Sequence, residues 1–367
     1  MKRHSFFRTT FLLALSIVTQ NAHSDAAFKT QEIASFNEPW AMTFLPSGKL
    51  LVTEKSGQLL LVSKSGEVSS PIKNVPKVAY GGQGGLGDVV LHPDFANNSR
   101  IYLSYAEAGE SKKYGAVVIS AKLDLNDNGG ALSDLKRVWE QTPKVTGRGH
   151  YGHRIAFDAD GYLFISSGER QKFDPSQDMN SNMGKIVRLN DDGSIPEDNP
   201  YFEKGGVTAQ IWSSGHRNPL GLAFDSKGRL WNAEMGPLHG DELNLVKRGA
   251  NYGYPTVSNG DHYSGKKIPD HDTQPQFEAP KAWWKPTIAP AEVVYYSGDM
   301  FEAWQGSFLI AGLRSNAIIR VEIDGDNAKE TERFEMSARI REIEQGHNGT
   351  LWVLEDGSNA KLLKLSK

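Results

Sequence analysis

Short stretches of alternating apolar and polar residues recur along the chain, each followed by a turn and a second apolar stretch. Alternation with a period of two predicts a β-strand with one buried face, and a turn containing glycine joins two such strands into a hairpin. Six hairpins are predicted in this way, over residues 40–53, 86–105, 154–166, 221–232, 291–312 and 341–353.

Six hairpins spaced roughly 45 to 75 residues apart predict small sheets that stack around a common axis. A single hairpin is too small to bury its own apolar face, so each needs neighbours. The expected fold class is all-β, a six-bladed β-propeller with long inserted loops. A two-sheet sandwich is the alternative that short strands also allow. No break in composition marks a linker, so we expect residues 25–367 to form one domain, with residues 28–33 as a candidate for the strand that closes the ring.

The first residues differ from the rest of the chain. Lys2, Arg3 and Arg8 precede or flank a short apolar run over residues 11–18, and small residues precede a possible cleavage point after Ser24. This order predicts a signal peptide over residues 1–24 that is removed on export. The apolar run is well short of the ~20 residues needed to cross a bilayer, so we expect no membrane anchor.

Composition narrows the chemistry. The chain has no cysteine, which excludes disulfides, thiolate nucleophiles and zinc sites with Cys ligands. A net charge of −3 with mixed signs gives no indication of nucleic-acid binding. No Gly-x-Gly-x-x-Gly run opens a predicted helix, and there is no P-loop and no Gly-x-Ser-x-Gly elbow. We therefore expect neither a nicotinamide or nucleotide enzyme nor a serine hydrolase.

Two polar segments offer a base and a cation. The segment 149–154 carries two histidines, and the imidazole is the side chain that titrates near neutrality, so it can act as a general base. The segment 214–219 places Arg217 and Asn218 before a proline, which displays a cation and an amide on extended backbone. Taken alone, each segment is also compatible with an ordinary polar turn.

Two further segments offer ligands for a metal and for anions. The segment 234–242 combines carboxylates with a Gly-Pro turn, and such oxygens are the ligands that calcium prefers. A solvated acidic turn is the alternative. Arg339 and Arg341 are two residues apart on a strand, so both project from one face and, with Arg217 and Arg314, can clamp an anionic ligand. Simple alternation on an exposed strand is the alternative for this pair.

In their order along the chain, these segments resemble the soluble PQQ-dependent glucose and aldose sugar dehydrogenases. The likeness covers the chain from Trp40 to its end and is closer to the periplasmic aldose dehydrogenases than to the larger glucose enzymes. The matching stretches are residues 82–86, 150–154, 183–190, 192–200, 215–219, 234–237, 241–244 and 251–255.

The resemblance implies an enzyme that oxidises aldoses to lactones with PQQ and Ca²⁺ and passes electrons to a periplasmic acceptor. It implies that His150 is the general base and that Glu169 orients it. The positions that match contacts to PQQ or substrate are Gln83, Arg217, Asn218, Thr287, Arg314, Arg339 and Arg341. The carbonyl groups of Gly236 and Pro237 match ligands of a calcium that polarises the quinone, and Asp241, Glu242 and Tyr252 match a second, structural calcium site.

Three positions depart from the family pattern. His153 replaces a glycine, and is expected either to crowd the pocket or to add a second titrating group. Arg314 replaces a lysine, which keeps the charge but replaces the single contact of an ammonium with the forked contact of a guanidinium. Lys285 replaces an aromatic residue that stacks on the cofactor, which bears on substrate preference.

Two other functions remain open from the sequence. A calcium-dependent lactonase on the same fold would need several carboxylates around one metal, whereas this chain concentrates arginines and amides. A non-catalytic propeller that binds a carbohydrate or a protein is the third possibility, because fold alone does not decide function. This third possibility predicts that His150 is dispensable.

Overall fold

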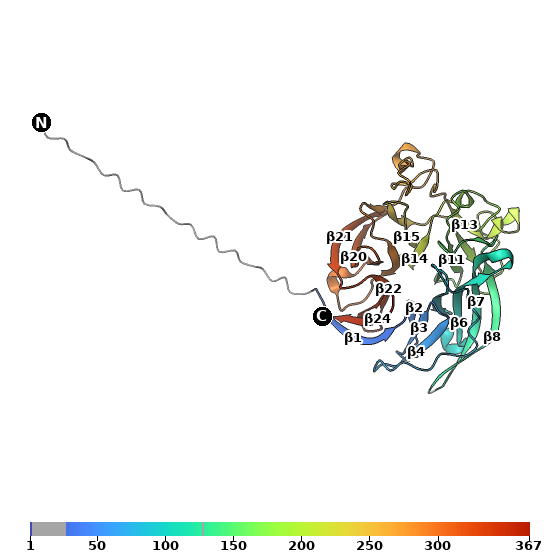
Figure 1. The fold of residues 1–367 in the computed structure, drawn as a ribbon, viewed down its shortest axis with the longest axis vertical. Coiled ribbons are helices and arrows are strands. Elements are labelled where there is room, and N and C mark those ends of the chain that lie inside the picture. The colour runs from blue at the N-terminus through green and yellow to red at the C-terminus, as the bar shows by residue number, and fades with distance from the viewer. Residues whose placement is uncertain (2–26, 127) are drawn as a thin grey trace.

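The computed structural model of the chain describes Met1, residues 27–126 and residues 128–367. Apart from Met1, the predicted signal peptide over residues 1–24 lies outside the described residues. Within the described part, the strands form six antiparallel sheets arranged around one axis (Figure 1). The predicted six-bladed β-propeller is confirmed, and the sandwich alternative is wrong.

Each predicted hairpin forms the two innermost strands of a blade. The first strands are β2 (Pro39–Phe44), β5 (Leu86–Leu91), β10 (Gly152–Phe157), β14 (Pro219–Phe224), β18 (Pro290–Tyr295) and β22 (Ile340–Gln345). They pair with β3 (Leu50–Glu54), β6 (Arg100–Ala108), β11 (Leu163–Ser167), β15 (Leu230–Glu234), β19 (Ser307–Gly312) and β23 (Leu351–Glu355). The first strands of neighbouring blades contact one another in a closed ring.

The outer strands complete the blades. The third strands are β4 (Gln58–Val62), β7 (Lys113–Asn126), β12 (Lys185–Leu189), β16 (Asp241–Leu245), β20 (Ala317–Asp324) and β24 (Ala360–Ser366). The fourth are β8 (Gly129–Glu140), β13 (Ile211–Ser214), β17 (Ala282–Trp284) and β21 (Asn327–Glu335), while the short β9 (Val145–Thr146) also pairs with β7. In the first blade, residues 69 and 72 donate hydrogen bonds to β4 in place of a regular fourth strand.

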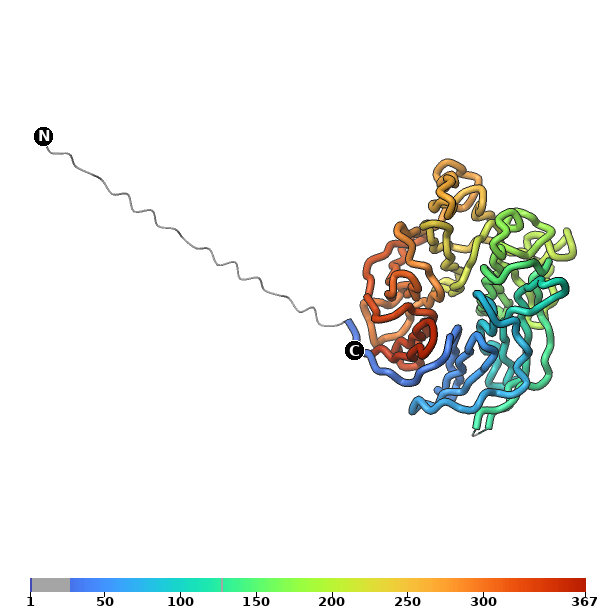
Figure 2. The backbone as a smooth tube through the Cα atoms, in the orientation of Figure 1, coloured from blue at the N-terminus to red at the C-terminus, as the bar shows by residue number. Residues whose placement is uncertain are grey.

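The ring closes through its two ends. The strand β1 (Lys29–Phe36) pairs antiparallel with β24, so the sixth blade takes its outer strand from the start of the described chain. Figure 2 shows the blue and red ends of the tube side by side at this blade. The predicted closing role of residues 28–33 is thereby confirmed for the segment that begins at Lys29.

Helices contribute little to the described chain. They are α1 (Phe95–Asn98) and the 3₁₀ turns η1 (Glu110–Lys112), η2 (Asp174–Ser176), η3 (Phe202–Lys204), η4 (Thr208–Gln210), η5 (His271–Thr273) and η6 (Glu302–Trp304). Within residues 27–126 and 128–367 none of them has the length and apolarity needed to cross a membrane.

The apolar core is divided among the junctions between blades. Each of six clusters of buried side chains in the described chain is formed mainly by two adjacent blades; Val118 of β7 and Ile165 of β11, for example, share one cluster. Burial between sheets, rather than within one sheet, therefore fixes the blades relative to one another.

One buried arginine joins the inner strands at the axis. Arg154 of β10 forms ion pairs with Asp88 of β5 at 3.1 Å, with Glu342 of β22 at 3.0 Å and with Glu292 of β18. Its Nε also donates to the carbonyl of Leu220 in β14 at 2.9 Å, and its guanidinium lies 4.3 Å from the ring centre of Trp40 in β2. Arg154 thus contacts the inner strands of the other five blades.

Candidate functional site

The predicted site residues lie at one end of the propeller. His150, Arg217 and Arg339 each come shortly before an inner strand, and Glu169, Gly236 and Arg314 each come just after the second strand of a blade. In a closed ring of antiparallel hairpins, the start of each first strand and the end of each second strand lie at the same rim. The segments that the sequence singled out therefore gather around one opening.

This end holds a cavity with two lobes. The His150 lobe, of about 370 Å³, is lined by His150, Arg217, Gly236, Pro237, Asp241, Thr287, Arg314 and others. The Arg339 lobe, of about 330 Å³, is lined by Arg339, Arg341, Asn218, Asp356, Trp40, His153 and others. Gln83, Met235 and Ala289 line both lobes, which makes the lobes adjacent parts of one site.

His150 is held by a buried carboxylate. Its Nδ1 lies 2.5 Å from Oε1 of Glu169, which is completely buried. The second oxygen of Glu169 accepts the backbone N–H groups of Lys172 and Phe173, the latter at 2.9 Å. The backbone N–H of His150 donates to the Gln83 side chain at 2.7 Å. The ring is therefore held through Nδ1 and the main chain of His150 through its N–H.

The protonation states of this pair follow from their surroundings. Burial lowers the pKa of His150, with Arg217 acting in the same direction and Glu169 opposing it. Burial opposes ionisation of Glu169, but the hydrogen bonds from His150 and from the backbone outweigh it and lower the pKa of that carboxyl. An ionised Glu169 can only accept, so Nδ1 of His150 carries the hydrogen and Nε2 keeps a free lone pair.

Arg217 and Asn218 are buried in the wall beside His150. Nη1 of Arg217 donates to the carbonyl of Met235 at 2.9 Å, and its backbone N–H donates to Glu234 at 3.1 Å. Within the described residues, Nε of Arg217 and Oδ1 of Asn218 are buried with no hydrogen-bond partner. Buried polar atoms are normally satisfied. These two groups therefore stay unsatisfied in residues whose side chains line the cavity.

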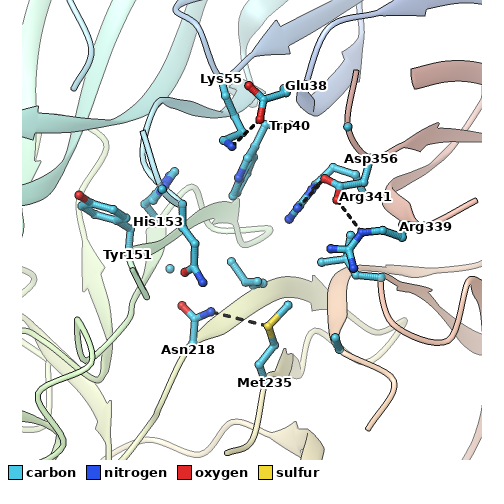
Figure 3. Close-up of a pocket in the computed structure, with 17 residues that line it drawn as sticks. Glu38, Trp40, Lys55, Tyr151, His153, Asn218, Met235, Arg339, Arg341 and Asp356 are labelled. Atoms are coloured by element: carbon cyan, nitrogen blue, oxygen red, sulfur yellow. Dashed lines mark hydrogen bonds and ion pairs between the residues drawn. The ribbon is translucent and has the colours of Figure 1, made fainter. Parts of the chain in front are cut away.

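Arg339 and Arg341 converge on one carboxylate. Nε of Arg339 lies 2.8 Å from one oxygen of Asp356, and Nη2 of Arg341 lies 2.7 Å from the other. Figure 3 shows the three side chains together at one edge of the cavity. The two guanidinium groups lower the pKa of Asp356 against the effect of its burial. The pair thus keeps a net positive charge toward the cavity.

The structure fits a calcium at the Gly-Pro turn. Gly236 and Pro237 line the His150 lobe, and their carbonyl oxygens accept no hydrogen bond from the described part of the chain. Asp241 supports this turn from behind: its oxygens accept the backbone N–H groups of Gly236, Ile288 and Ala289 at 2.7–2.9 Å, and the hydroxyl of Thr287. Asp241 therefore holds the turn, and its role as a calcium ligand stays a prediction.

A second cluster of oxygens surrounds Glu242. The ladder pairs Glu234 with Glu242 and Asn232 with Asn244, and alternation places all four side chains on one face of the sheet. The amide oxygens of both asparagines are buried without a donor among the described residues. Burial, followed by the neighbouring Glu234, raises the pKa of Glu242 well above its ordinary value. This arrangement suits a bound cation.

Tyr252, the third residue predicted for that site, lies behind the cavity wall. Its ring stacks on His216 with 4.7 Å between ring centres, and its carbonyl accepts a hydrogen bond from His271 at 3.1 Å. No group of three or more His, Asp or Glu side chains is placed to hold a metal in residues 27–126 and 128–367. A calcium here would depend on amide and main-chain oxygens as well as carboxylates.

The two departures at His153 and Lys285 have different outcomes. His153 does line the Arg339 lobe, but it is 2% exposed, stacks on Trp40 at 4.9 Å and bonds to Ser104 at 2.7 Å. A side chain at Gly87 would collide with its ring. Burial, helped by Arg154, lowers the pKa of His153 to about 3, so it does not titrate near neutrality. Lys285 is exposed, and within the described part of the chain it lines neither lobe.

Sequence reasoning missed several lining residues. Asp356 follows β23, and Glu38 and Lys55 flank the first hairpin, where they form an ion pair of 3.0 Å. Met235 was read only as part of a motif, although it lines both lobes. The signal that was available is positional: each of these residues directly precedes an inner strand or follows the second strand of a blade, as the predicted site residues do.

Comparison with known proteins gives a consistent result. A family model described as glucose/sorbosone dehydrogenase matches residues 36–364. An aldose sugar dehydrogenase from Escherichia coli is 38% identical over 372 residues, which cover 100% of this chain and 99% of the relative. The crystal structure of the soluble aldose sugar dehydrogenase from Escherichia coli, in the apo-form, has a TM-score of 0.87 at 38% identity and covers 92% of this chain and 99% of that chain.

A cofactor-bound structure is also similar. The PQQ-bound form of an aldose sugar dehydrogenase from Streptomyces coelicolor has a TM-score of 0.78 at 29% identity, with 93% of this chain and 99% of that chain covered. These likenesses extend over all six blades and include the rim that forms the cavity.

Proposed function

The chain belongs to the glucose/sorbosone dehydrogenase family, and we propose that it oxidises aldose sugars at the anomeric carbon to lactones with PQQ and calcium. The observation that carries the proposal is the His150–Glu169 pair, at 2.5 Å, in the wall of a cavity that four arginines line. A neutral imidazole beside a cationic wall is suited to take a proton next to an anionic ligand.

The reaction removes a proton from the anomeric hydroxyl and a hydride from its carbon. His150 would accept the proton at Nε2, because Nδ1 is committed to Glu169. The ionised Glu169 would then stabilise the imidazolium that forms. Since the pKa of His150 is lowered from its ordinary value, the ring is already unprotonated at neutral pH.

The cavity wall supplies the binding groups. Arg217, Arg314, Arg339 and Arg341 would hold the carboxylates of PQQ by charge-assisted hydrogen bonds. Asn218, Gln83 and Thr287 would orient the quinone and the sugar. The carbonyls of Gly236 and Pro237 would hold one calcium, and the oxygens around Glu242 a second. When bound, PQQ would supply a two-electron acceptor, and calcium would supply the Lewis acid that polarises it.

The direct test is reconstitution. PQQ and Ca²⁺ are added to the purified protein, and reduction of an artificial electron acceptor is followed with a panel of aldoses. We expect activity that needs both additions. Absence of both PQQ binding and dye reduction contradicts the proposal. His150→Ala should bind PQQ normally and lose about 10²- to 10⁴-fold in kcat. Full turnover by this variant would favour another base.

The structure gives no support to a lactonase. The carboxylates that face the channel, Asp88, Glu292 and Glu342, surround Arg154 instead of a metal position. The non-catalytic alternative is separated from the dehydrogenase by the same His150→Ala variant, because a binding module would not depend on that ring.

We also propose that residues 1–24 direct export to the periplasm, where an acceptor protein takes the electrons. The basic and apolar order of these residues supports this. Mass spectrometry of the protein isolated from its host is expected to find a mature N-terminus at Asp25. A retained N-terminus would contradict the proposal.

A further inference from the structure

Met235 lies where the two lobes of the cavity adjoin. It follows β15, and its side chain lines both lobes, as do Gln83 and Ala289. The same side chain packs against two apolar clusters, one between the first and second blades and one between the fifth and sixth. It is half-buried, so part of it is reachable from the cavity. Met235 thus connects the cavity with two separate junctions between blades.

The main chain of Met235 is held firmly by two predicted binding residues. Its N–H donates to the carbonyl of Asn218 at 3.2 Å, and its carbonyl accepts Nη1 of Arg217 at 2.9 Å. The sulfur lies 4.0 Å from Nδ2 of Asn218. Figure 3 shows the thioether beside Asn218, across the cavity from Trp40. The main chain that carries this thioether is therefore held in place beside the cavity.

The lining of the Arg339 lobe divides into charged and apolar groups. The charged groups stand at the edge, as Arg339, Arg341 and Asp356 do in Figure 3. The apolar groups include Met235, Ala289, Leu220 and Leu313. A ligand that matches this division is a flat ring system with anionic groups on its rim. Methionine sulfur makes favourable contacts with aromatic rings and adapts its shape to them.

We propose that Met235 is a cofactor contact, the surface on which the planar ring system of PQQ rests. This inference depends on the proposed function, because it takes PQQ as the ligand of the cavity. It adds a residue that no family motif assigned, and it makes a chemical prediction about that residue in the free and loaded protein.

The prediction concerns oxidation of the sulfur. Hydrogen peroxide transfers one oxygen atom to a thioether, which becomes a sulfoxide, while the peroxide is reduced to water. The free protein exposes Met235 to the cavity, so its sulfur should react. A ring lying on the sulfur should block this reaction. In turn, a sulfoxide placed beforehand should weaken cofactor binding, because it puts a polar group under an apolar ring face.

The experiment is peroxide mapping of the whole protein with and without PQQ and Ca²⁺. Sulfoxide formation at each methionine is read by peptide mass spectrometry, and PQQ binding is measured in the same samples by absorbance titration. Met336 is the internal control, because it is also half-buried against the cluster between the fifth and sixth blades but lines neither lobe. We expect PQQ to slow oxidation of Met235 at least about 5-fold and to leave Met336 unchanged.

The outcomes separate this inference from the function it rests on. PQQ binding with equal oxidation of Met235 in both samples overturns the Met235 contact and leaves the cofactor assignment intact. No PQQ binding at all contradicts the proposed function, and this inference with it.

Substitutions provide the second measurement. Met235→Ala should weaken PQQ binding by about 3- to 10-fold, and Met235→Leu, which keeps the volume, by less than about 3-fold. Met336→Ala is the matched control for loss of packing and should leave PQQ affinity unchanged. Thermal unfolding of the three variants shows whether each is folded. Equal PQQ affinity in folded Met235→Ala and wild type would overturn the contact.

Discussion

The cavity lies at one end of the propeller, and a channel lined by Arg154, Asp88, Glu292, Glu342 and Glu344 lies at the axis. The two regions differ in the number of carboxylates beside their arginines. In the two lobes, Arg217, Arg314, Arg339 and Arg341 face the cavity, and Asp356 is the one acidic side chain that forms ion pairs with any of them in the described chain. In the channel, Arg154 pairs with Asp88, Glu292 and Glu342, and Glu344 lines the same space. The cavity has a surplus of positive charge, whereas the channel has more carboxyl groups than arginines.

The difference indicates which arginines serve binding and which serve the fold. A buried charge is tolerated when its partners are built in, as they are for Arg154. A surplus of one sign at an open cavity needs a ligand of the other sign, which an anionic cofactor would supply. The two regions should therefore respond to substitution in opposite ways, one in stability and one in affinity.

The largest effect is expected from Arg154→Met. The change would leave Asp88, Glu292 and Glu342 buried without their cation, at a cost of about 3–5 kcal/mol in the free energy of unfolding. Urea unfolding measures it. A loss below about 1 kcal/mol would mean that the channel charges do not depend on Arg154, and the contrast with the cavity would fail.

Glu169→Gln tests whether a carboxylate at the cavity acts on chemistry instead of stability. The amide can still hold the ring of His150, but it cannot stabilise an imidazolium as a charge does. We expect kcat to fall about 10- to 100-fold with PQQ affinity unchanged. The pH profile of kcat should shift to lower pH, because the carboxylate raises the pKa of His150. An unchanged profile would remove Glu169 from the role of positioning residue.

Arg339→Met is the counterpart of Arg154→Met in the cavity. Its side chain is 50% exposed and Asp356 keeps Arg341 as a partner, so stability should change by less than about 1 kcal/mol. The loss of one charged hydrogen-bond donor should weaken PQQ binding about 10-fold. Fluorescence titration with PQQ gives the affinity, and urea unfolding gives the stability. A large loss of stability with unchanged affinity would reverse the assignment of the two regions.

The sequence predicted the contacts of the cavity better than those of the channel. Each hairpin is local, so its alternation was visible, and the rim segments carry compact motifs such as residues 215–219. The partners of Arg154 are separated from it by 66 residues at Asp88 and by 188 at Glu342. No local pattern marks such a set. Of the two roles expected for His153, titration near neutrality fails for a related reason, because the burial that lowers its pKa depends on Trp40 from another blade.

The outer strands could not be predicted from the local sequence pattern either. In the first blade, β4 ends at Val62 and an irregular segment takes the place of a fourth strand. In the fourth blade, a long loop separates β16 from the three-residue β17. Pairing in these places is decided by the neighbouring blade and not by alternation along the strand.

The smallest expected effect is on the pH dependence of stability, through Glu344 in the channel. Burial, followed by the nearby Asp88, raises the pKa of Glu344 from 4.5 to about 7, while Arg154 opposes the shift. A carboxyl whose pKa is raised on folding binds more protons in the folded state. Its contribution to stability is complete below about pH 4.5 and is lost as the pH rises toward 7.

Glu344→Gln keeps the side chain neutral at every pH. Relative to wild type, the variant should therefore gain stability between pH 5 and pH 8, by about 1 kcal/mol because Glu344 is only half-buried. Unfolding curves at the two pH values measure the difference, and Glu335→Gln, on the exposed outer strand β21, is the control that should show none. If the two variants behave alike, water screens the Glu344 carboxyl, and the contrast with the cavity narrows to the three carboxyl groups that touch Arg154.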